Sequence, residues 1–382
     1  MTLSTDHKHS IIRILFTVPN FISAGSGQVM FNILTRLDAS VFTPTICVQR
    51  KGGVLDARLE SMGYKVLELP FTVPAKPYTS LPFRAYKVAK KFREYGFDLW
   101  HSFHYSDDYT EPMIARLSGA KAWIYTKKSM MWGSRAWIIR SLLASRIVAD
   151  NAEMPLLFFN RFGMAKKTQV IVHGIPLDEF SPVSSIDTPK SQLHDIPADA
   201  FCVGCVAHLV PVKGHPTLIE AVSKLENVHL FLAGSALDQV YTNHLKEQVV
   251  NLGLKQRVHF LGNITDVSGF ISQMDIVVLP TWDKWRKEAF DVVLIEAMAC
   301  GKACIASDIS GPRQIIEDGI SGFLVPPEDP DELVRVIHDL QQDPELRIEI
   351  GLRARKRVVE YFDIQKEVAA HEKLYLEIIS NI

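Results

Sequence analysis

The sequence predicts an α/β protein with two doubly wound domains, each built on a parallel sheet. The chain has 382 residues, 47% of them hydrophobic and 22% charged, which is ordinary globular usage but more than one hydrophobic core usually supports. Short apolar runs alternate with longer amphipathic runs, a pattern typical of parallel strands covered by helices on both faces. A polar segment with three prolines, residues 181–200, interrupts this alternation. We therefore expect domains at 1–180 and 201–362, joined by a linker at 181–200.

In the first half, strand-length apolar runs end at glycine, proline or polar residues, and helical periodicity fills the intervals. The run from Ile11 to Val18 is interrupted by Arg13 and followed by Pro19, which favours a first strand over a signal peptide. No run is long and apolar enough to span a bilayer, so we expect a cytoplasmic protein. The expected strands are 12–18, 45–48, 65–69 and 99–103, and the expected helices are 28–37, 55–62 and 82–95.

The same rhythm resumes after residue 200. An apolar run begins at Phe201, a loop carries Lys213 and Gly214, and a helix begins near Pro216. Asp329 and Asp331 have the spacing of a metal-binding pair, but they precede a helix, where acids commonly cap the first turn. The remaining expected strands are 228–233, 258–261, 276–279 and 303–306, with helices at 292–300 and 364–379.

The five cysteines indicate a reducing compartment, because an odd number cannot all pair within the chain. Cys202 and Cys205 form a Cys-x-x-Cys pattern inside an expected strand. That spacing sends the two thiols to opposite faces of the sheet, so we expect core thiols.

Charge is balanced overall at −1 but divided unevenly along the chain. Residues 1–180 hold 23 Lys and Arg against 14 Asp and Glu, a net of +9, and residues 181–382 hold 19 against 29, a net of −10. The segment from Ala120 to Ala149 has six bases and three tryptophans but no acid before Asp150. Two interpretations stay open: a helix that lies on an anionic membrane or grips an acidic lipid-linked acceptor, or a domain helix with core aliphatics and solvated bases.

The stretch 288–326 carries the main functional pattern. Glu288 lies before a helix that should begin near Val292 and end at Gly301, and Glu296 lies about one turn inside that helix. Free amides near Asp291, Val292 and Val293 would point outward at the helix start and bind a phosphate or diphosphate. Two carboxylates beside an anion site suit a sugar nucleotide, because hydroxyls need acceptors and phosphates need donors.

Two further loops fit the same ligand. Lys213 follows the strand that begins at Phe201, and its single ammonium group suits a diphosphate at the carboxyl end of a parallel sheet. Gly25 and Gly27 lie in a glycine loop between the first strand and the next helix, where the backbone can approach a phosphate or an acceptor closely.

In combination, Glu-x7-Glu, the following EAMACGKA, Asp318-Gly319 and GFLVPPEDP resemble the donor segment of the family-4 retaining glycosyltransferases. The resemblance is strong over about 201–335 and weak before 180. It implies the GT-B fold, two Rossmann-like domains whose parallel sheets face a central cleft. It also implies that the last helix, within 363–382, packs back on the first domain.

The resemblance assigns roles to individual residues. Glu296 would hold the ribose hydroxyls and Glu288 the donor sugar, while Lys213 and the amides of 291–293 would stabilise the leaving diphosphate. The glycines would reach the reactive end of the donor. The donor set is Gly25, Gly27, His208, Lys213, Leu261, Glu288, Phe290, Asp291, Val292, Val293 and Glu296, and the acceptor-side set is His101, Lys127, Lys128 and Arg135.

Two positions depart from the family pattern. His208 stands where relatives usually carry Arg, so either it binds protonated or Lys284, Arg286 or Lys287 substitutes. Lys128 stands where relatives often carry His, so either it contacts an acidic acceptor or the alignment slips locally. Of the residues discussed, Glu288, Lys213, His208 and Lys128 are the expected catalytic group.

The expected activity is transfer of a sugar from a nucleotide-diphosphate sugar to an acceptor hydroxyl, with retained anomeric configuration. We expect no metal or other cofactor and no nucleic-acid partner, and an acceptor that is a glycan or a lipid-linked molecule. Two alternatives remain: a sugar-nucleotide epimerase or phosphorylase on the same fold, and a catalytically idle nucleotide-sugar sensor.

Overall fold

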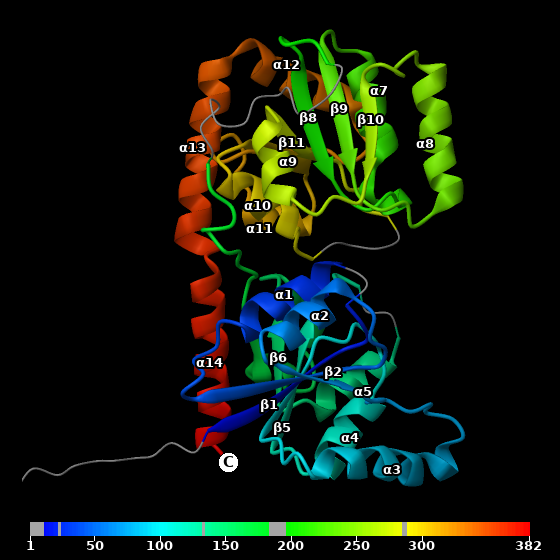
Figure 1. The fold of residues 1–382 in the computed structure, drawn as a ribbon, viewed down its shortest axis with the longest axis vertical. Coiled ribbons are helices and arrows are strands. Elements are labelled where there is room, and N and C mark those ends of the chain that lie inside the picture. Colours follow the sequence, from blue (N-terminus) through cyan, green and yellow to red (C-terminus); the bar gives the residue numbers. More distant parts are fainter. Residues whose placement is uncertain (1–10, 22–23, 132–133, 183–195, 285–288) are drawn as a thin grey trace, which may run out of the picture. The chain divides into compact units, whose positions relative to one another are not determined.

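The computed structural model describes residues 11–21, 24–131, 134–182, 196–284 and 289–382 (Figure 1). Contacts divide the chain into two units. Unit 1 comprises Met1–His173 and Ile364–Ile382, and unit 2 comprises Gly174–Asp363. Most of the linker expected at 181–200 lies outside the described residues. The final segment, from Ile364 onward, is part of unit 1.

Unit 1 is built on a parallel sheet of seven strands in the order β3-β2-β1-β4-β5-β6-β7. The strands are β1 (Ile12–Val18), β2 (Phe42–Val48), β3 (Lys65–Glu68), β4 (Leu99–Ser102), β5 (Ala122–Lys127), β6 (Arg146–Ala149) and β7 (Thr168–Val170). Its helices are α1 (Ala24–Leu34), α2 (Val54–Ser61), α3 (Leu81–Arg93), α4 (Thr110–Ser118), α5 (Ala136–Leu143), α6 (Met154–Phe159) and α14 (Ile364–Ser380). Helix α3 packs mainly against α4, and its Phe92 ring lies 4.8 Å from the ring of Trp100 in β4 (Figure 1).

Unit 2 has a parallel sheet of six strands in the order β10-β9-β8-β11-β12-β13. The strands are β8 (Phe201–Val206), β9 (Val228–Ala233), β10 (Val258–Gly262), β11 (Ile276–Leu279), β12 (Ala303–Ser307) and β13 (Phe323–Val325). The helices are α7 (His215–Ser223), α8 (Gln239–Asn251), α9 (Val267–Gln273), α10 (Val292–Ala299), α11 (Ser310–Ile315), α12 (Pro330–Gln342) and α13 (Pro344–Tyr361).

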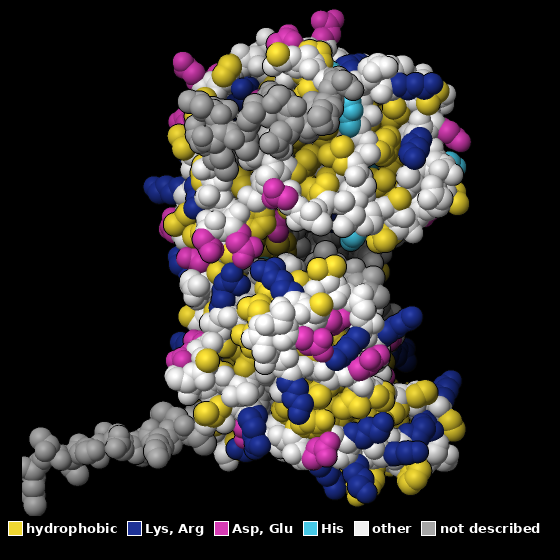
Figure 2. All heavy atoms as spheres, viewed as in Figure 1, with side chains coloured by type: hydrophobic (Ala, Val, Ile, Leu, Met, Phe, Trp, Pro, Cys, Tyr) yellow, Lys and Arg dark blue, Asp and Glu magenta, His cyan; other side chains and the backbone are white. Residues whose placement is uncertain are grey.

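The central strands are buried on both faces, as near-continuous apolar runs predict for parallel sheets. Ile14, Leu15 and Phe16 in unit 1 and Val277 and Val278 in unit 2 are fully buried. All five cysteines are buried and none forms a disulfide, which confirms the expectation of core thiols. Charged side chains spread over the visible surface (Figure 2).

Three expected strands, 12–18, 228–233 and 276–279, match β1, β9 and β11 to the residue. The expectation of a glycine loop before a helix at Gln28 is wrong, because α1 already begins at Ala24 and both Gly25 and Gly27 lie in its first turn. A Cβ on Gly27 would lie 2.7 Å from the Phe21 ring, so this glycine allows the helix to pack closely there.

The interpretation of the basic segment 120–149 as helical holds only for part of it. The segment contains β5, the eight-residue α5 and β6. Tryptophans and aliphatic residues that alternate with bases satisfy a buried strand as well as an amphipathic helix, and neighbouring strands decided the outcome here.

Candidate functional site

Each sheet has one point where the strand order reverses, and the expected site residues follow the strands at these points. In unit 2 the reversal falls between β8 and β11, and in unit 1 between β1 and β4. In open α/β sheets ligands bind outside the carboxyl ends of the strands at such a reversal. Lys213 follows β8 and Asp291 follows β11, while Gly25 follows β1 and His101 lies within β4.

The loops after β8 and β11 are locked together, which fixes the position of Lys213. Gly214 has a φ of +67°, and a Cβ there would lie 1.9 Å from the Pro280 carbonyl oxygen, so only glycine fits. The Trp282 amide donates to the Val212 carbonyl at 2.8 Å, and the Trp282 indole N–H donates to the Thr217 hydroxyl at 3.0 Å. Lys213 therefore projects from a rigid turn.

The ammonium group of Lys213 lies 3.3 Å from a carboxylate oxygen of Asp291. Asp291 is the residue before α10, and its side chain makes no capping hydrogen bond to that helix. The amides of Val292 and Val293 open α10, and both side chains are half-buried. The structure thus brings a cation and a helix amino terminus to the same point, as the sequence predicted.

Glu296 lies one turn inside α10 and is half-buried. Burial, together with the negative charge of Glu179, raises the pKa of Glu296 to about 7. A carboxyl group with a pKa near neutrality can accept or donate a hydrogen bond, which suits recognition of a vicinal diol. Glu288, Arg286 and Lys287 lie outside the described residues, so the second carboxylate of the motif cannot be placed.

His208 lies half-buried after β8, and its Nδ1 is buried without a hydrogen-bond partner. Burial and the charge of Lys213 lower the pKa of His208 below its usual value. A neutral imidazole at neutral pH follows, which opposes the interpretation that His208 binds protonated. Lys284, one of the substitutes considered for its charge, is engaged with Glu328 at 2.5 Å.

Leu261 and Phe290 have different surroundings. Leu261 is 40% exposed near the end of β10, so its backbone and side chain are available to a ligand. Phe290 is 8% exposed, and its ring packs edge-on against Phe362 with centroids 5.8 Å apart. The Phe290 side chain is therefore part of the core, although its backbone immediately precedes Asp291.

On unit 1, His101 is fully buried and does not present its imidazole to solvent. Its Nδ1 is 2.7 Å from the Tyr375 hydroxyl of α14, and its Nε2 is 2.9 Å from the Thr126 hydroxyl of β5. Burial, with the positive neighbours His371 and Lys128, lowers the pKa of His101 well below its usual value. A neutral His101 thus links the sheet to α14, a structural role that the acceptor-side assignment did not foresee.

Lys127 and Lys128 end β5 and are held by backbone carbonyl oxygens. Lys127 is buried and donates to the carbonyls of Ser129 and Met131, both at 2.7 Å, and desolvation lowers its pKa to about 8. Lys128 donates to the Phe103 carbonyl, and burial lowers its pKa to about 7. Lys128 retains some exposure and is therefore the better placed of the two for an acceptor.

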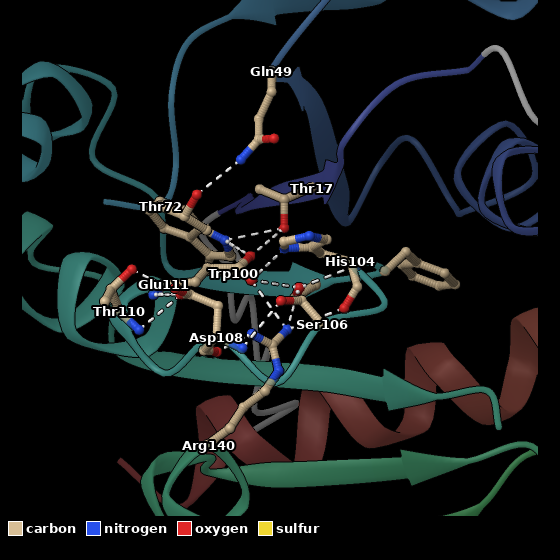
Figure 3. Close-up of polar contacts among 12 residues, drawn as sticks. Thr17, Gln49, Thr72, Trp100, His104, Ser106, Asp108, Thr110, Glu111 and Arg140 are labelled. Atoms are coloured by element: carbon tan, nitrogen blue, oxygen red, sulfur yellow. Dashed lines mark hydrogen bonds and ion pairs between the residues drawn. The ribbon is translucent and has the colours of Figure 1, made fainter. Parts of the chain in front are cut away.

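A buried ion pair at the carboxyl edge of the unit 1 sheet was not foreseen (Figure 3). Arg140 and Glu111 are both fully buried, 3.1 Å apart. The guanidinium also donates to the Asp108 carbonyl and lies 4.8 Å from the centre of the Trp123 ring. Arg140 therefore cannot lie on a membrane surface or contact an acceptor, and that interpretation of this residue is wrong.

Glu111 accepts four hydrogen bonds, one each from Thr17, Trp100, Ser102 and Arg140. Burial acts to raise the pKa of Glu111, but the charge of Arg140, the nearby His104 and the hydrogen bond from Thr17 outweigh it, and the pKa falls to about 2. His104 approaches the same carboxylate, with Nδ1 at 3.8 Å, and its ring packs on Phe71. A single Glu inside a helix gave no sequence signal for this network.

Gly25 is exposed in the first turn of α1, and a Cβ there would meet nothing within 4 Å. Arg135 is exposed just before α5.

Within the described ranges no group of three or more His, Cys, Asp or Glu side chains could hold a metal ion. Asp329 accepts a hydrogen bond from the Glu332 amide at 3.0 Å, which confirms that it caps α12.

No helix among the described residues is both long and apolar enough to cross a bilayer.

Residues 188–357 match the family model described as "Glycosyl transferases group 1". A D-inositol 3-phosphate glycosyltransferase of Streptomyces bingchenggensis is 27% identical over 247 residues, which cover 61% of this chain and 53% of that protein. The chain thus spans about half the length of this relative. A UDP-Gal:alpha-D-GlcNAc-diphosphoundecaprenol alpha-1,3-galactosyltransferase of Escherichia coli is 23% identical over 312 residues, 78% of this chain and 79% of that one.

Among solved structures, Anabaena HepE in complex with UDP-glucose superposes with a TM-score of 0.79 at 23% identity, covering 97% of this chain and all of that one. At this identity the likeness shows the fold. With two parallel-sheet units, this fold is GT-B. The match over 188–357 covers less than half of this chain, and it shows that most of unit 2 is similar to the group 1 glycosyl transferases.

Proposed function

We propose that this protein is a retaining, metal-independent glycosyltransferase that moves a sugar from a nucleotide-diphosphate sugar to an acceptor hydroxyl. The products would belong to glycan, lipopolysaccharide or glycolipid synthesis. The observation that carries the proposal is the convergence of Lys213, the amino terminus of α10 and Glu296 at the strand reversal of unit 2.

The donor's diphosphate would lie against Lys213 and the amides of Val292 and Val293. Negative charge grows on the leaving diphosphate as the sugar departs. Each hydrogen-bond donor held in place beside it contributes about 3 kcal/mol of transition-state stabilisation. A diphosphate would compete with Asp291 for the Lys213 ammonium. Because His208 is neutral, Lys213 and the helix dipole carry most of the positive charge in this proposal.

Glu296 would bind the two ribose hydroxyls. Its raised pKa reflects desolvation, which two hydroxyl donors would offset by stabilising the carboxylate. Glu288 keeps its expected role toward the donor sugar, as a proposal without a structural position. A departing phosphate oxygen takes the acceptor proton, so no side-chain base is required.

The comparisons support both substrates. The HepE structure contains UDP-glucose, and the Escherichia coli relative is named for a UDP-galactose donor and a diphosphoundecaprenol-linked acceptor. A lipid-linked, phosphate-bearing acceptor would be anionic, and Lys128 at the end of β5 would contact it. Arg135, exposed before α5, would add a second positive contact.

The proposal is tested with a panel of nucleotide sugars, first by thermal shift and then by transfer to lipid-linked acceptors. We expect one nucleotide sugar to raise the melting temperature of the protein and to support transfer. NMR of the product should show the same anomeric configuration as the sugar had in the donor. Lys213→Met should lower kcat by more than about 100-fold, from one lost charged contact of about 3 kcal/mol. Lys255→Met, a change at an exposed lysine elsewhere in unit 2, serves as the matched control.

The alternatives give other outcomes. Binding without turnover would indicate a sensor, and a changed donor sugar without any acceptor would indicate an epimerase. Transfer with the inverted configuration would overturn the retaining mechanism, and loss of transfer on chelation of metal ions would overturn metal independence.

A further inference from the structure

Helix α3 and the 3-10 turn before it, Tyr78–Ser80, present an outward face of aromatic and basic side chains. We name it the α3 surface: Tyr78 from the turn, and Phe83, Tyr86, Lys87 and Lys90 from the helix. All five side chains are exposed. Phe83 is 72% exposed and Tyr78 61% exposed, unusually high for large apolar side chains. Figure 2 shows basic side chains interspersed with hydrophobic ones over this helix.

The sequence of α3 explains this arrangement. Leu81, Ala85, Ala89 and Phe92 recur at helical spacing and are buried, so one stripe of the helix packs inward on α4. At 100° per residue, Phe83, Lys87 and Lys90 fall on the opposite side. Pro82 fits the first turn, and Lys90, Lys91 and Arg93 in the last turn favour the helix dipole.

Charge around this helix has one sign. From Leu69 to Arg93 the chain has six bases and no acid: Lys76, Arg84, Lys87, Lys90, Lys91 and Arg93. On the helix packed beneath, Arg116 is exposed and adds a further positive charge. Arg93 lies 4.9 Å from the centre of the Tyr86 ring and donates to the Leu117 carbonyl at 3.1 Å, which holds the base and the aromatic ring together.

We infer that the α3 surface docks on an anionic lipid bilayer, with Phe83 and Tyr78 entering the headgroup region and the lysines contacting lipid phosphates. Positive charge draws the helix to an anionic surface. Exposed aromatic rings on the same face then gain from the interfacial region, where amphipathic helices bury their apolar side. Fully buried Arg140 and buried Lys127 cannot supply this contact, whereas every side chain of the α3 surface is exposed.

A lipid surface fits better than an acidic protein because the aromatic side chains stand separately along a convex helix. The inference needs no catalytic activity, so it survives or fails independently of the proposed function.

The test uses the full chain and vesicle sedimentation with phosphatidylcholine alone or with 30% phosphatidylglycerol. We expect sedimentation only with anionic vesicles and a decrease as salt is raised. Lys87→Gln with Lys90→Gln should lower the partition coefficient about 25-fold, at about five-fold per base. The matched control, Lys255→Gln with Lys356→Gln, removes two exposed lysines of unit 2 and should leave binding unchanged.

A second variant separates lipid insertion from simple charge attraction. Phe83→Ser should weaken vesicle binding several-fold at constant charge. In the Phe83→Trp variant, brominated lipid should quench the fluorescence of the added tryptophan. Equal loss in the control pair, no effect of Phe83→Ser, or no wild-type binding to anionic vesicles would each overturn the inference. Saturable binding to an acidic polypeptide or RNA with no vesicle binding would overturn it in favour of that partner. Because all five altered side chains are exposed, circular dichroism should confirm unchanged folding.

Discussion

Replacing Arg140 by Met should destabilise unit 1 strongly, because Glu111 would keep a buried carboxylate without its cation. The pair is fully buried at 3.1 Å, and Arg140 also holds the Asp108 carbonyl. Removing one partner of such a pair costs about 3–5 kcal/mol. The pKa of Glu111 gives a similar magnitude: a fall from 4.5 to about 2 corresponds to about 3 kcal/mol.

The pH dependence distinguishes this mechanism from lost packing. In the wild type the folded pKa of Glu111 is depressed, so its contribution is present above about pH 4.5 and is lost as pH falls through about 2. Without Arg140, burial should raise that pKa above 4.5. Stability of the Arg140→Met variant should therefore fall as pH rises from 5 to 8, whereas the contribution of Glu111 in the wild type is constant over that range.

Urea unfolding followed by tryptophan fluorescence measures this effect, since four of the six tryptophans, Trp100, Trp123, Trp132 and Trp137, belong to unit 1. The double variant Glu111→Leu with Arg140→Met removes both charges and should recover at least 2 kcal/mol of the loss. A single-variant cost below about 1 kcal/mol, or a double variant as unstable as Arg140→Met, would refute the reasoning.

Three further predictions concern titratable groups. His173 is clamped between Asp150 at 3.4 Å and Glu367 at 3.0 Å; burial acts against its charge, but these carboxylates raise its pKa to about 9. The contribution of charged His173 to folding stability should therefore be complete below about pH 6.5 and lost as pH rises through 9. In urea titrations, His173→Gln should cost of order 3 kcal/mol at pH 6 and little at pH 10. A cost that does not depend on pH would contradict this. Glu296 has a folded pKa raised to about 7, so its carboxylate opposes folding above that pH. Glu296→Gln should therefore raise the melting temperature, and by more at pH 8.5 than at pH 5.5. Calorimetry should show weaker binding of the nucleotide sugar, and tighter binding would exclude the ribose role. Lys128 has a pKa of about 7 and should lose its charge above neutral pH. In initial-rate assays, Lys128→Met should raise the KM for an anionic acceptor at pH 6 but not at pH 9. An unchanged KM at pH 6 would remove Lys128 from the acceptor side.

Much of unit 2 was predictable because its signals are local. A strand-length apolar run, a loop with Lys213-Gly214 and a helix opening at Val292 each depend on a few adjacent residues, and the parallel sheet then brings the loops together. The positions of β9 and β11 follow from the same runs.

The misjudged residues depend on partners distant in the chain. Arg140 is 29 residues from Glu111, and His101 is 274 residues from Tyr375. A base beside tryptophans has the same sequence pattern whether the base is solvated or paired inside the core.

The sequence by itself determined the alternating α/β pattern, the two parallel-sheet units, and the cation and helix start of the proposed donor site. Periodicity and turn residues act over one or two turns of chain, so these features are set locally. Only the tertiary structure decided which charges are buried, that His101 binds α14 and that α3 carries the exposed basic face. Burial of a charge depends on whether an opposite charge and hydrogen-bond partners meet it, and that meeting is set by packing of elements far apart in the chain.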